Sequence, residues 1–136
     1  MPPDVIGILR EHGIQPSAQR VAVAQYVLRT DEHPSADRVW AAVKEKFPMI
    51  SRATVYNTLN LFVAKGLVRE LHLAPDSVVF DPKLEPHHHL IDDDNGRIHD
   101  IAWDDVEVCN IKKIGNYEIS HYQVVMHGRR RRPLRA

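Results

Sequence analysis

Residues 51–66 of this 136-residue chain read SRATVYNTLNLFVAKG, a pattern typical of an amphipathic helix with a defined start and end. Ser51 is a residue type that caps helix N-termini, and Gly66 is a residue type that ends them. Apolar side chains recur at helical spacing and predict a buried face: Val55, Leu59, Phe62 and Val63. Polar side chains occupy the other faces and remain available to solvent or a partner: Arg52, Tyr56, Asn57 and Asn60.

The residues around this helix predict a winged helix-turn-helix. Ser17 and Ser35 precede two further helical patterns, and a short helix is expected from Val5 to Glu11. After Gly66, two short strands are expected at 67–73 and 77–80, around the turn sequence Ala-Pro-Asp. Helices followed by a hairpin are the order found in winged-helix DNA-binding domains, so we assign residues 1–81 to such a domain.

A second, smaller domain is predicted after the linker 82–86, which is bracketed by prolines. Strands at 87–92 and 97–101 flank Asn95-Gly96, which predicts a hairpin with a two-residue turn. A helical fragment is expected at 104–113 and a strand at 117–126. The fold class is therefore α+β, with a small α/β domain at 87–128 and a basic tail at 129–136 that we expect to be disordered.

The formal charge of zero hides three unlike regions. Residues 1–70 carry 9 basic and 7 acidic side chains, residues 71–128 carry 4 and 11, and residues 129–136 carry 5 and none. A mildly basic first half suits a polyanion, whereas an acidic second half that contains most of the histidines suits a cation.

Cysteine content and the absence of apolar runs narrow the class of protein. The one cysteine, Cys109, excludes an internal disulfide and any cysteine-rich zinc site, and we expect it to be a buried filler rather than a redox group. The N-terminus, Met1-Pro2-Pro3-Asp4, does not resemble a secretory signal, and no apolar stretch approaches the roughly 20 residues that span a bilayer. We therefore expect a cytoplasmic protein without a membrane partner.

The N-terminal part of the 51–66 helix carries the side chains expected to contact DNA. Arg52 suits a bidentate contact to guanine, and Tyr56 suits packing on a thymine methyl group. Ser51 and Thr54 suit phosphate contacts, and Asn57 lies on an exposed face. The alternative is an ordinary amphipathic helix whose exposed side happens to be polar.

A candidate metal site lies in the first strands of the second domain. His87 and His89 share one face because strand side chains alternate. The two-residue turn pairs Ile91 with Asp100, which puts Asp100 on the same face, one diagonal step from His89. Two imidazoles and a carboxylate suit a borderline divalent ion. The alternative reading is a solvated polar strand end.

Four motifs in order along the chain resemble the ferric uptake regulator family. They are Ile14-Gln15-Pro16-Ser17-Ala18-Gln19-Arg20, His33-Pro34-Ser35-Ala36-Asp37, Ser51-Arg52-Ala53-Thr54-Val55-Tyr56-Asn57-Thr58-Leu59 and Gly66-Leu67-Val68. The resemblance implies a homodimeric, metal-dependent transcriptional repressor that binds a double-stranded DNA operator. It also implies that Arg52 and Tyr56 contact bases, and that residues 87–128 form the dimerisation domain.

The resemblance also implies further metal ligands. The family's regulatory site takes ligands before the third helix and at the end of the wing, where this chain has His33 and Asp81. The implied set is His33, Asp81, His87, His89 and Asp100, holding Fe(II) or Mn(II), with Zn(II) as a substitute. An ion bound by both domains fixes their angle, and DNA binding by the dimer follows from that angle.

Two features depart from the family pattern. Many relatives bind a structural zinc through two pairs of cysteines, but this chain has Asp92 and Asn95 where the first pair lies, so no such zinc site is expected. A second family site is incomplete. Its candidate residues for a secondary metal or haem are His88, His99, Glu107 and His121.

The residue type at position 100 indicates the expected signal. An aspartate at this ligand position resembles the peroxide-sensing branch of the family. In that branch Fe(II) and peroxide oxidise a ligand histidine, so His33 and His87 are the candidate oxidation sites. A haem-responsive iron regulator of the same family is the alternative, because of the triple histidine. A non-haem metalloenzyme or a metal carrier is the alternative of another class. We expect no enzymatic activity and no small-molecule substrate.

Overall fold

The computed structural model describes residues 4–74 and 76–132, and the chain divides into two compact units, 1–84 and 85–136. The division falls within the predicted linker 82–86. Residues 1–3, part of the N-terminal segment that was compared with a secretory signal, lie outside the described residues. Pro75 of the predicted wing turn and residues 133–136 of the predicted basic tail also lie outside them. The two units are described separately below.

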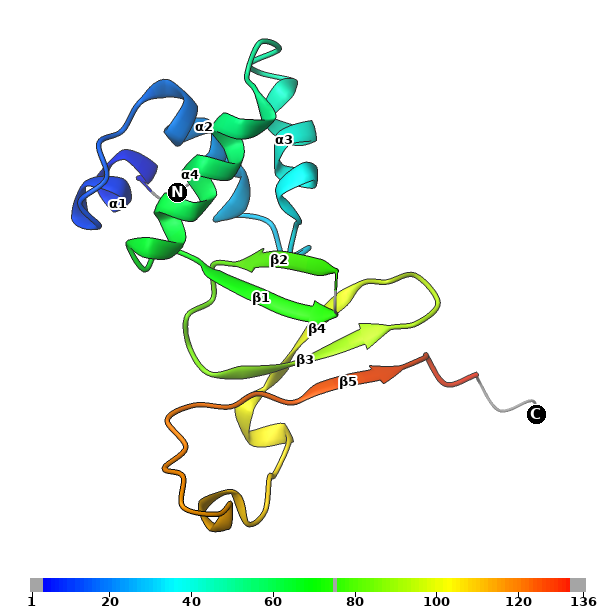
Figure 1. The fold of residues 1–136 in the computed structure, drawn as a ribbon. Helices are drawn as coiled ribbons and strands as arrows, with labels where there is room; N and C mark the ends of the chain where they lie inside the picture. Colours follow the sequence, from blue (N-terminus) through cyan, green and yellow to red (C-terminus); the bar gives the residue numbers. More distant parts are fainter. Residues whose placement is uncertain (1–3, 75, 133–136) are drawn as a thin grey trace. The chain divides into compact units, whose positions relative to one another are not determined.

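The first unit begins with four helices, as the sequence predicts (Figure 1). They are α1 (Val5–Glu11), α2 (Ala18–Val27), α3 (Ala36–Lys44) and α4 (Arg52–Ala64). The hydroxyls of Ser17, Ser35 and Ser51 accept hydrogen bonds from backbone N–H groups three residues further on, at 3.2, 3.2 and 3.0 Å. All three predicted N-caps are therefore confirmed, and each fixes where its helix starts.

The hydrophobic core of the first unit lies between these helices. Leu59 and Phe62 of α4 are fully buried together with Val23, Val27 and Val39. The apolar face predicted for residues 51–66 packs against the other helices, although Val63 at the edge of this face is only half-buried. The opposite face of α4 remains exposed, which leaves its polar side chains available.

A hairpin follows the helices and completes the predicted winged helix. It consists of β1 (Arg69–Ala74) and β2 (Ser77–Asp81), which pair antiparallel with Arg69 opposite Asp81. The backbone N–H of Phe80 donates to the carbonyl of Pro34 at 2.9 Å. This bond ties the end of β2 to the loop before α3.

The second unit is built on a three-stranded sheet of β3 (His87–Asp92), β4 (Ile98–Ala102) and β5 (Val125–Gly128), in the order β4-β3-β5 (Figure 1). The central strand β3 pairs antiparallel with β4 and parallel with β5. The α+β class predicted from the sequence is confirmed.

The predicted two-residue turn between β3 and β4 is wrong. The loop contains four residues, 93–96, because Asp92 pairs with Arg97 through the N–H of Asp92 and the carbonyl of Arg97 at 2.9 Å. Gly96 adopts a φ of 73° and donates its N–H to the carbonyl of Asp92 at 2.7 Å. Asn-Gly favours a tight turn, but here the glycine provides the left-handed residue that closes a longer loop.

The expected helix 104–113 and strand 117–126 are also largely wrong. Only two short 3-10 helices form, η1 (Trp103–Asp105) and η2 (Ile111–Lys113), because Val106 is extended and Asn110 is left-handed with a φ of 64°. The strand starts only at Val125, where β3 offers an edge for pairing. Residues 117–122 have no ladder partner among the described residues, so they do not form a strand.

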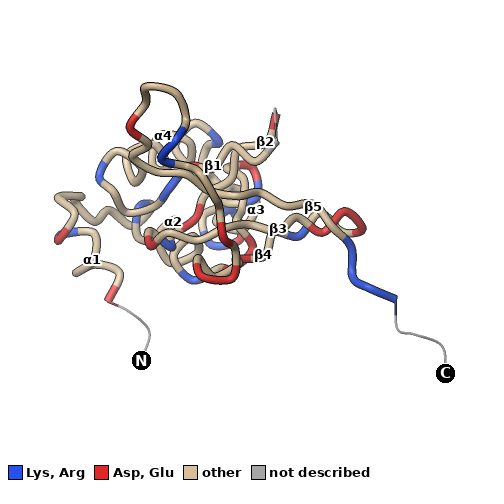
Figure 2. The backbone as a smooth tube through the Cα atoms, turned by 90° about the horizontal axis from the view of Figure 1, so that it is seen from below, with Lys and Arg blue, Asp and Glu red and all other residues tan. Residues whose placement is uncertain are grey.

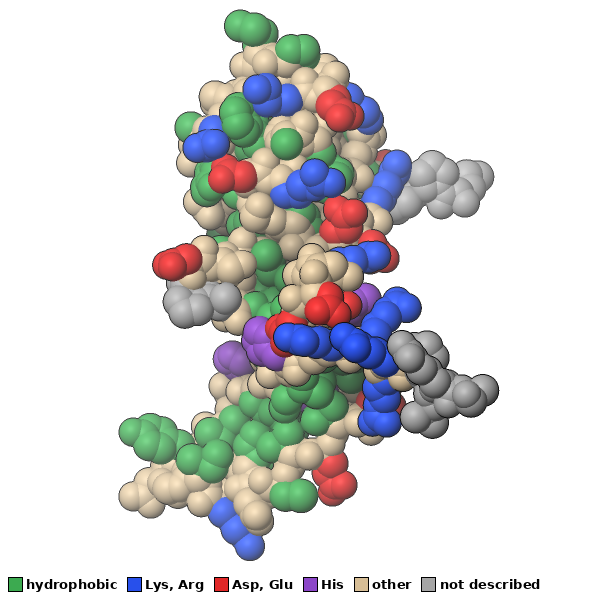
Figure 3. All heavy atoms as spheres, turned by 90° about the vertical axis from the view of Figure 1, so that its right-hand side faces the viewer, with side chains coloured by type: hydrophobic (Ala, Val, Ile, Leu, Met, Phe, Trp, Pro, Cys, Tyr) green, Lys and Arg blue, Asp and Glu red, His purple; other side chains and the backbone are tan. Residues whose placement is uncertain are grey.

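The second unit buries polar rather than apolar side chains. Among its described residues, the buried ones are three consecutive histidines of β3 and Asp92, and no hydrophobic side chain is buried. Several hydrophobic side chains are instead exposed, at 53% for Ile114, 78% for Tyr117 and 39% for Ile119. Figure 3 shows hydrophobic side chains gathered on one face of this unit.

Opposite charges meet where β5 ends. His127 contacts Asp93 at 3.1 Å and Arg129 contacts Asp94 at 3.8 Å, which links the β3–β4 loop to the start of the arginine run. Figure 2 shows the basic segment after β5 beside an acidic loop. These pairs are exposed, so each contributes little to stability. Of the helices described, none has the length and hydropathy to cross a bilayer.

The core of the first unit generates a stability prediction. Leu59→Ala removes a fully buried side chain from α4, whereas Asn60→Ala alters the exposed neighbour on the same helix. We expect Leu59→Ala to lower the free energy of unfolding by about 2–5 kcal/mol, and Asn60→Ala to change it by less than about 0.5 kcal/mol. Urea denaturation followed by circular dichroism measures both. Equal effects of the two variants would contradict the assigned packing face.

Candidate metal centre

The first unit contributes a buried His–Asp pair. His33 lies in the loop before α3, and Asp81 is the last residue of β2. The hydrogen bond from Phe80 to Pro34 holds these two segments side by side. The Nε2 atom of His33 lies 3.4 Å from Oδ2 of Asp81, and both side chains are only 3% exposed. The other carboxylate oxygen of Asp81 accepts the N–H of Lys83 at 2.9 Å.

His33 is held in an unusual backbone conformation. Its φ is 54°, in the left-handed region, and it precedes Pro34, which further restricts its backbone. A non-glycine residue in this region costs on the order of 1 kcal/mol, and such strain concentrates at functional sites. The strain indicates that the position of this imidazole is fixed by its surroundings.

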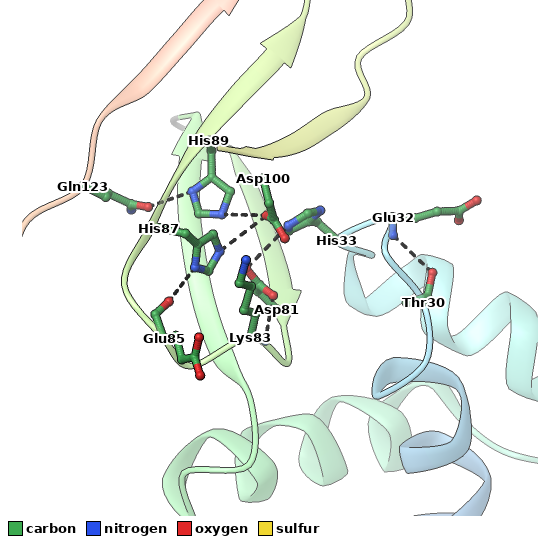
Figure 4. A network of polar contacts seen from close by, with 10 residues as sticks. All are labelled: Thr30, Glu32, His33, Asp81, Lys83, Glu85, His87, His89, Asp100 and Gln123. Atoms are coloured by element: carbon green, nitrogen blue, oxygen red, sulfur yellow. Dashed lines mark hydrogen bonds and ion pairs between the residues drawn. The ribbon is translucent and has the colours of Figure 1, made fainter. Parts of the chain in front are cut away.

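The second unit contributes two histidines and a carboxylate on one face of its sheet. His87 and His89 alternate along β3, and Asp100 of β4 lies directly opposite His89. The Nε2 atoms of His87 and His89 lie 3.4 and 3.6 Å from the same Oδ1 of Asp100 (Figure 4). The imidazoles are at most 1% exposed, and the carboxylate is 32% exposed. One side of the group is therefore open to solvent.

The shared face was predicted correctly, but the register was not. Ile91 pairs with Ile98 rather than with Asp100, because the loop is two residues longer than a two-residue turn. A shift by two residues leaves each side chain on its predicted face. It moves Asp100 from a diagonal position to one directly opposite His89, which brings the three side chains closer than expected.

Hydrogen bonds at the far side of each ring orient the two imidazoles. Nδ1 of His87 donates to the carbonyl of Glu85 at 2.6 Å, because a carbonyl can only accept. Nδ1 of His89 donates to the side-chain oxygen of Gln123 at 2.9 Å. In the neutral rings both Nε2 atoms then present lone pairs toward Asp100. This arrangement is typical of metal-binding histidines, whose outer nitrogen is fixed by a hydrogen bond.

The donor atoms of each unit suit a borderline divalent cation. Imidazole nitrogens with carboxylate oxygens are compatible with Fe(II), Mn(II) and Zn(II). Two imidazole nitrogens that face one carboxylate together offer several donor atoms to a single positive charge. The residues present therefore fit a bound metal ion, and all five belong to the potential metal-binding side chains of the described chain.

The four residues of the predicted secondary site are not gathered. None joins a group of three or more potential metal ligands in the part of the chain that the structure describes. His88 is fully buried, stacks on Trp103 with ring centroids 4.6 Å apart, and its Nδ1 accepts the N–H of Val124 at 2.9 Å. His99 is half-buried, and Glu107 and His121 are exposed. His88 is thus engaged in packing.

The predicted DNA-contacting residues lie at the start of α4. Ser51 and Thr54 share a hydrogen bond between their hydroxyls at 2.8 Å, in addition to the N-cap. Arg52 and Tyr56 both contact Asp37 of α3, and Asn57 is exposed. All except the half-buried Thr54 are exposed, so this end of the helix is accessible.

Asp92 and Asn95 occupy the positions at which the family resemblance would place the first pair of cysteines. Asp92 is buried, and its side chain accepts the N–H of Asp94 at 2.9 Å, while Asn95 accepts the N–H of Arg97 at 2.8 Å. Both side chains therefore stabilise the β3–β4 loop. Cys109 is exposed, so the expectation that it fills a buried space is wrong. It lies in the irregular segment between η1 and η2.

The ferric uptake regulator family model matches residues 11–127. The chain belongs to this family. The peroxide operon regulator of Bacillus subtilis is 34% identical over 128 residues, which cover 92% of this chain and 88% of that protein. The peroxide-responsive repressor PerR of Staphylococcus epidermidis is 33% identical over 126 residues, which cover 90% of this chain and 83% of that protein.

Solved structures agree with this assignment. The ferric uptake regulator of Vibrio cholerae has a TM-score of 0.74 at 25% identity, covering 93% of this chain and 99% of that one. The peroxide stress regulator of Campylobacter jejuni has a TM-score of 0.66 at 28% identity, covering 97% of this chain and 100% of that one. The family resemblance inferred from the four motifs is confirmed. As a member of the ferric uptake regulator family, the chain is a metal-dependent transcriptional regulator and not an enzyme.

Sequence reasoning missed the groups that orient the imidazoles. Gln123 lies 34 residues from His89 in the chain, in a segment without regular secondary structure. The partner of His87 is a backbone carbonyl, which any residue at position 85 would supply. No pattern in the sequence marks either group.

The contact between Gln123 and His89 can be tested directly. Gln123→Leu removes the acceptor that fixes the ring of His89, so we expect the affinity for Mn(II) to fall about 10- to 100-fold. Isothermal titration calorimetry measures it. Gln19→Leu, at an exposed position of α2, is the matched control and should leave the affinity unchanged. An unaltered affinity in Gln123→Leu would show that the amide does not orient a ligand.

Proposed function

We propose that this family member represses transcription by binding a DNA operator as a homodimer when one divalent ion is held by His33, Asp81, His87, His89 and Asp100. The observation that carries the proposal is the pair of Nε2 atoms that face one carboxylate in the second unit, at 3.4 and 3.6 Å. This arrangement offers several donor atoms to one cation, and the family is metal-dependent.

Two considerations support a single ion for both donor sets. Each set is incomplete by itself, because two or three protein ligands leave coordination positions open. The chain between Asp81 and His87 is also short, and six residues span at most about 22 Å when fully extended. A tether of this length allows both sets to bind the same ion.

An ion shared in this way couples metal binding to DNA binding. His33 and Asp81 belong to the winged-helix unit, and the other three ligands belong to the second unit. The ligands fix the angle between the units, and the spacing of the two reading helices in a dimer follows from that angle. A binding free energy of several kcal/mol is sufficient to shift an equilibrium between open and closed arrangements.

We propose Fe(II) or Mn(II) as the regulatory ion, with Zn(II) as a substitute. Three imidazole nitrogens and two carboxylate oxygens form a mixed set that several borderline ions accept. No zinc site made of four cysteines can form within the chain, because Cys109 is its one cysteine. The side-chain caps at Asp92 and Asn95 support the loop where relatives use cysteines.

DNA reading is assigned to the exposed N-terminal part of α4. We propose base contacts by Arg52 and Tyr56, and contacts to the DNA backbone by Ser51, Thr54 and Asn57. The first helical turn suits this role because its N–H groups and small hydroxyls face a phosphate easily. An operator partner also implies that the protein acts inside the cell.

The second unit supports a homodimer. It has no buried hydrophobic side chain among its described residues, while Ile114, Tyr117 and Ile119 are exposed. A unit of this size without an apolar core gains stability when another surface covers its apolar face. We propose that a second copy of the chain does so.

We propose that the signal is peroxide. Two relatives that are 33% and 34% identical to this chain over the aligned residues are named as peroxide regulators. In the proposed response, peroxide would be the oxidant: one of its oxygen atoms would add to a ring carbon of His33 or His87, the other would leave as water, and the oxidised ligand would release the ion. The haem-responsive alternative has less support, because His88 stacks on Trp103 and its Nδ1 is occupied by Val124.

The first functional test asks whether bound metal increases the affinity for operator DNA. We expect wild-type protein to bind its operator at least about tenfold more tightly with Mn(II) than after chelation, and His89→Ala to lose this difference. Fluorescence anisotropy at constant salt measures both. His127→Ala, an exposed histidine of the same unit, is the control and should respond like wild type. Metal-independent operator binding by wild type would contradict the gating.

The second functional test asks whether peroxide oxidises a ligand histidine. Protein loaded with Fe(II) and exposed to peroxide should gain the mass of one oxygen atom on the peptide containing His33 or that containing His87. Protein loaded with Mn(II) should not, because Mn(II) does not carry out this reaction with peroxide. Peptide mass spectrometry locates the added atom. Oxidation confined to methionine or to the exposed Cys109 would count against the peroxide proposal.

A further inference from the structure

Asp37 connects the two side chains that we assign to base reading. It lies in the first turn of α3, next to α4. Its Oδ1 accepts a hydrogen bond from the hydroxyl of Tyr56 at 3.2 Å and pairs with Nε of Arg52, also at 3.2 Å. One carboxylate oxygen of Asp37 therefore contacts both Tyr56 and Arg52. No role for Asp37 was predicted from the sequence.

Trp40 completes the environment of Arg52. The guanidinium of Arg52 lies 5.0 Å from the centre of the Trp40 ring, within the range of a cation–π contact. The indole is fixed by a hydrogen bond from Nε1 to the carbonyl of Ile50 at 3.0 Å. In the free protein Arg52 is thus held against α3 by a carboxylate and an aromatic face.

The groove beside Tyr56 has the same sign of charge as DNA. This groove, of about 410 Å³, lies between the start of α3, α4 and the hairpin. Three carboxylates line it together with Tyr56 and Asn60 of α4: Asp37, Glu70 and Asp76. An acidic surface next to a DNA-reading helix repels phosphates, so it weakens any contact that is not matched by specific bonds.

We propose that Asp37 is a specificity-determining residue, which holds Arg52 and Tyr56 as a preset pair and withholds the guanidinium of Arg52 from the phosphates of non-operator DNA. Non-specific binding depends on free cationic groups that displace counterions from phosphates. The carboxylate of Asp37 offsets part of the charge of Arg52, which therefore contributes less to such binding. At the operator, bidentate bonds to a base edge compensate for the lost pair. The inference rests on the proposed role of α4.

The simplest competing explanation is local. An acidic residue in the first turn of a helix stabilises that helix through its dipole, and Asp37 occupies such a position in α3. That role requires no contact with α4 and does not distinguish between DNA sequences. The two explanations therefore differ in DNA binding rather than in stability.

The experiment compares operator and non-operator DNA. Duplexes selected from a random pool by the Mn(II)-loaded full chain define the operator, and a scrambled duplex of equal length is the non-operator probe. Asp37→Asn is compared with Glu45→Gln, which removes the same charge from the exposed C-terminal end of α3. Both are repeated in an Arg52→Gln background, and anisotropy is measured over a range of salt concentrations.

We expect Asp37→Asn to bind the scrambled duplex about threefold or more tightly than wild type, with a smaller change on the operator. Its salt dependence on the scrambled duplex should steepen by about one phosphate contact. In the Arg52→Gln background the gain should shrink to that of Glu45→Gln, because the guanidinium that Asp37 restrains is gone.

Equal gains on both duplexes, or the same gain with and without Arg52, would overturn the inference and leave general charge repulsion as the cause. If Asp37→Asn loses helix content, Asp37→Ser provides the second variant, since serine is well tolerated near helix starts. Failure of wild type to select any duplex would instead reject the proposed function, which is a different result from an operator-binding protein insensitive to Asp37.

Discussion

The convergence of donor atoms on one face of the second unit's sheet is the constraint on which the rest depends. Two imidazole nitrogens face one carboxylate oxygen at 3.4 and 3.6 Å, and their outer nitrogens are already committed to Glu85 and Gln123. Such a group suits a cation, so we expect the sheet that holds it to be more stable when metal is bound. In a regulator this dependence is useful, because it converts the presence of an ion into a structural state.

The two units use opposite means to become stable. The first unit has a continuous hydrophobic core among α1–α4 and the hairpin, and its helices start at side-chain caps. The second unit buries histidines and an aspartate instead, and exposes apolar side chains. The first unit is thus a stable carrier of α4, whereas in the proposed function the second depends on what it binds, an ion and a second copy of the chain.

We assign two roles to different faces of α4, packing in the core and contact with DNA. Leu59 and Phe62 anchor it in the core, and Arg52 and Tyr56 lie on the accessible side, where Asp37 holds both. Rigid anchoring of the backbone keeps the exposed side chains in a reproducible geometry, which is what sequence-selective contacts require. In the proposed function, the helix that anchors the fold therefore also determines how precisely DNA is read.

The sequence by itself determined the local features: the serine caps, the apolar face of α4, the hairpin, and the shared face of His87, His89 and Asp100. These depend on periodicity and on residue types at fixed spacing, which a chain carries without knowledge of distant contacts. Only the tertiary structure decided the register that brings Asp100 opposite His89, the contact of Gln123, and the loss of the expected helix at 104–113. Each of these depends on segments far apart in the chain or on a loop length, and a strand or helix forms only where a partner surface satisfies its backbone and side chains.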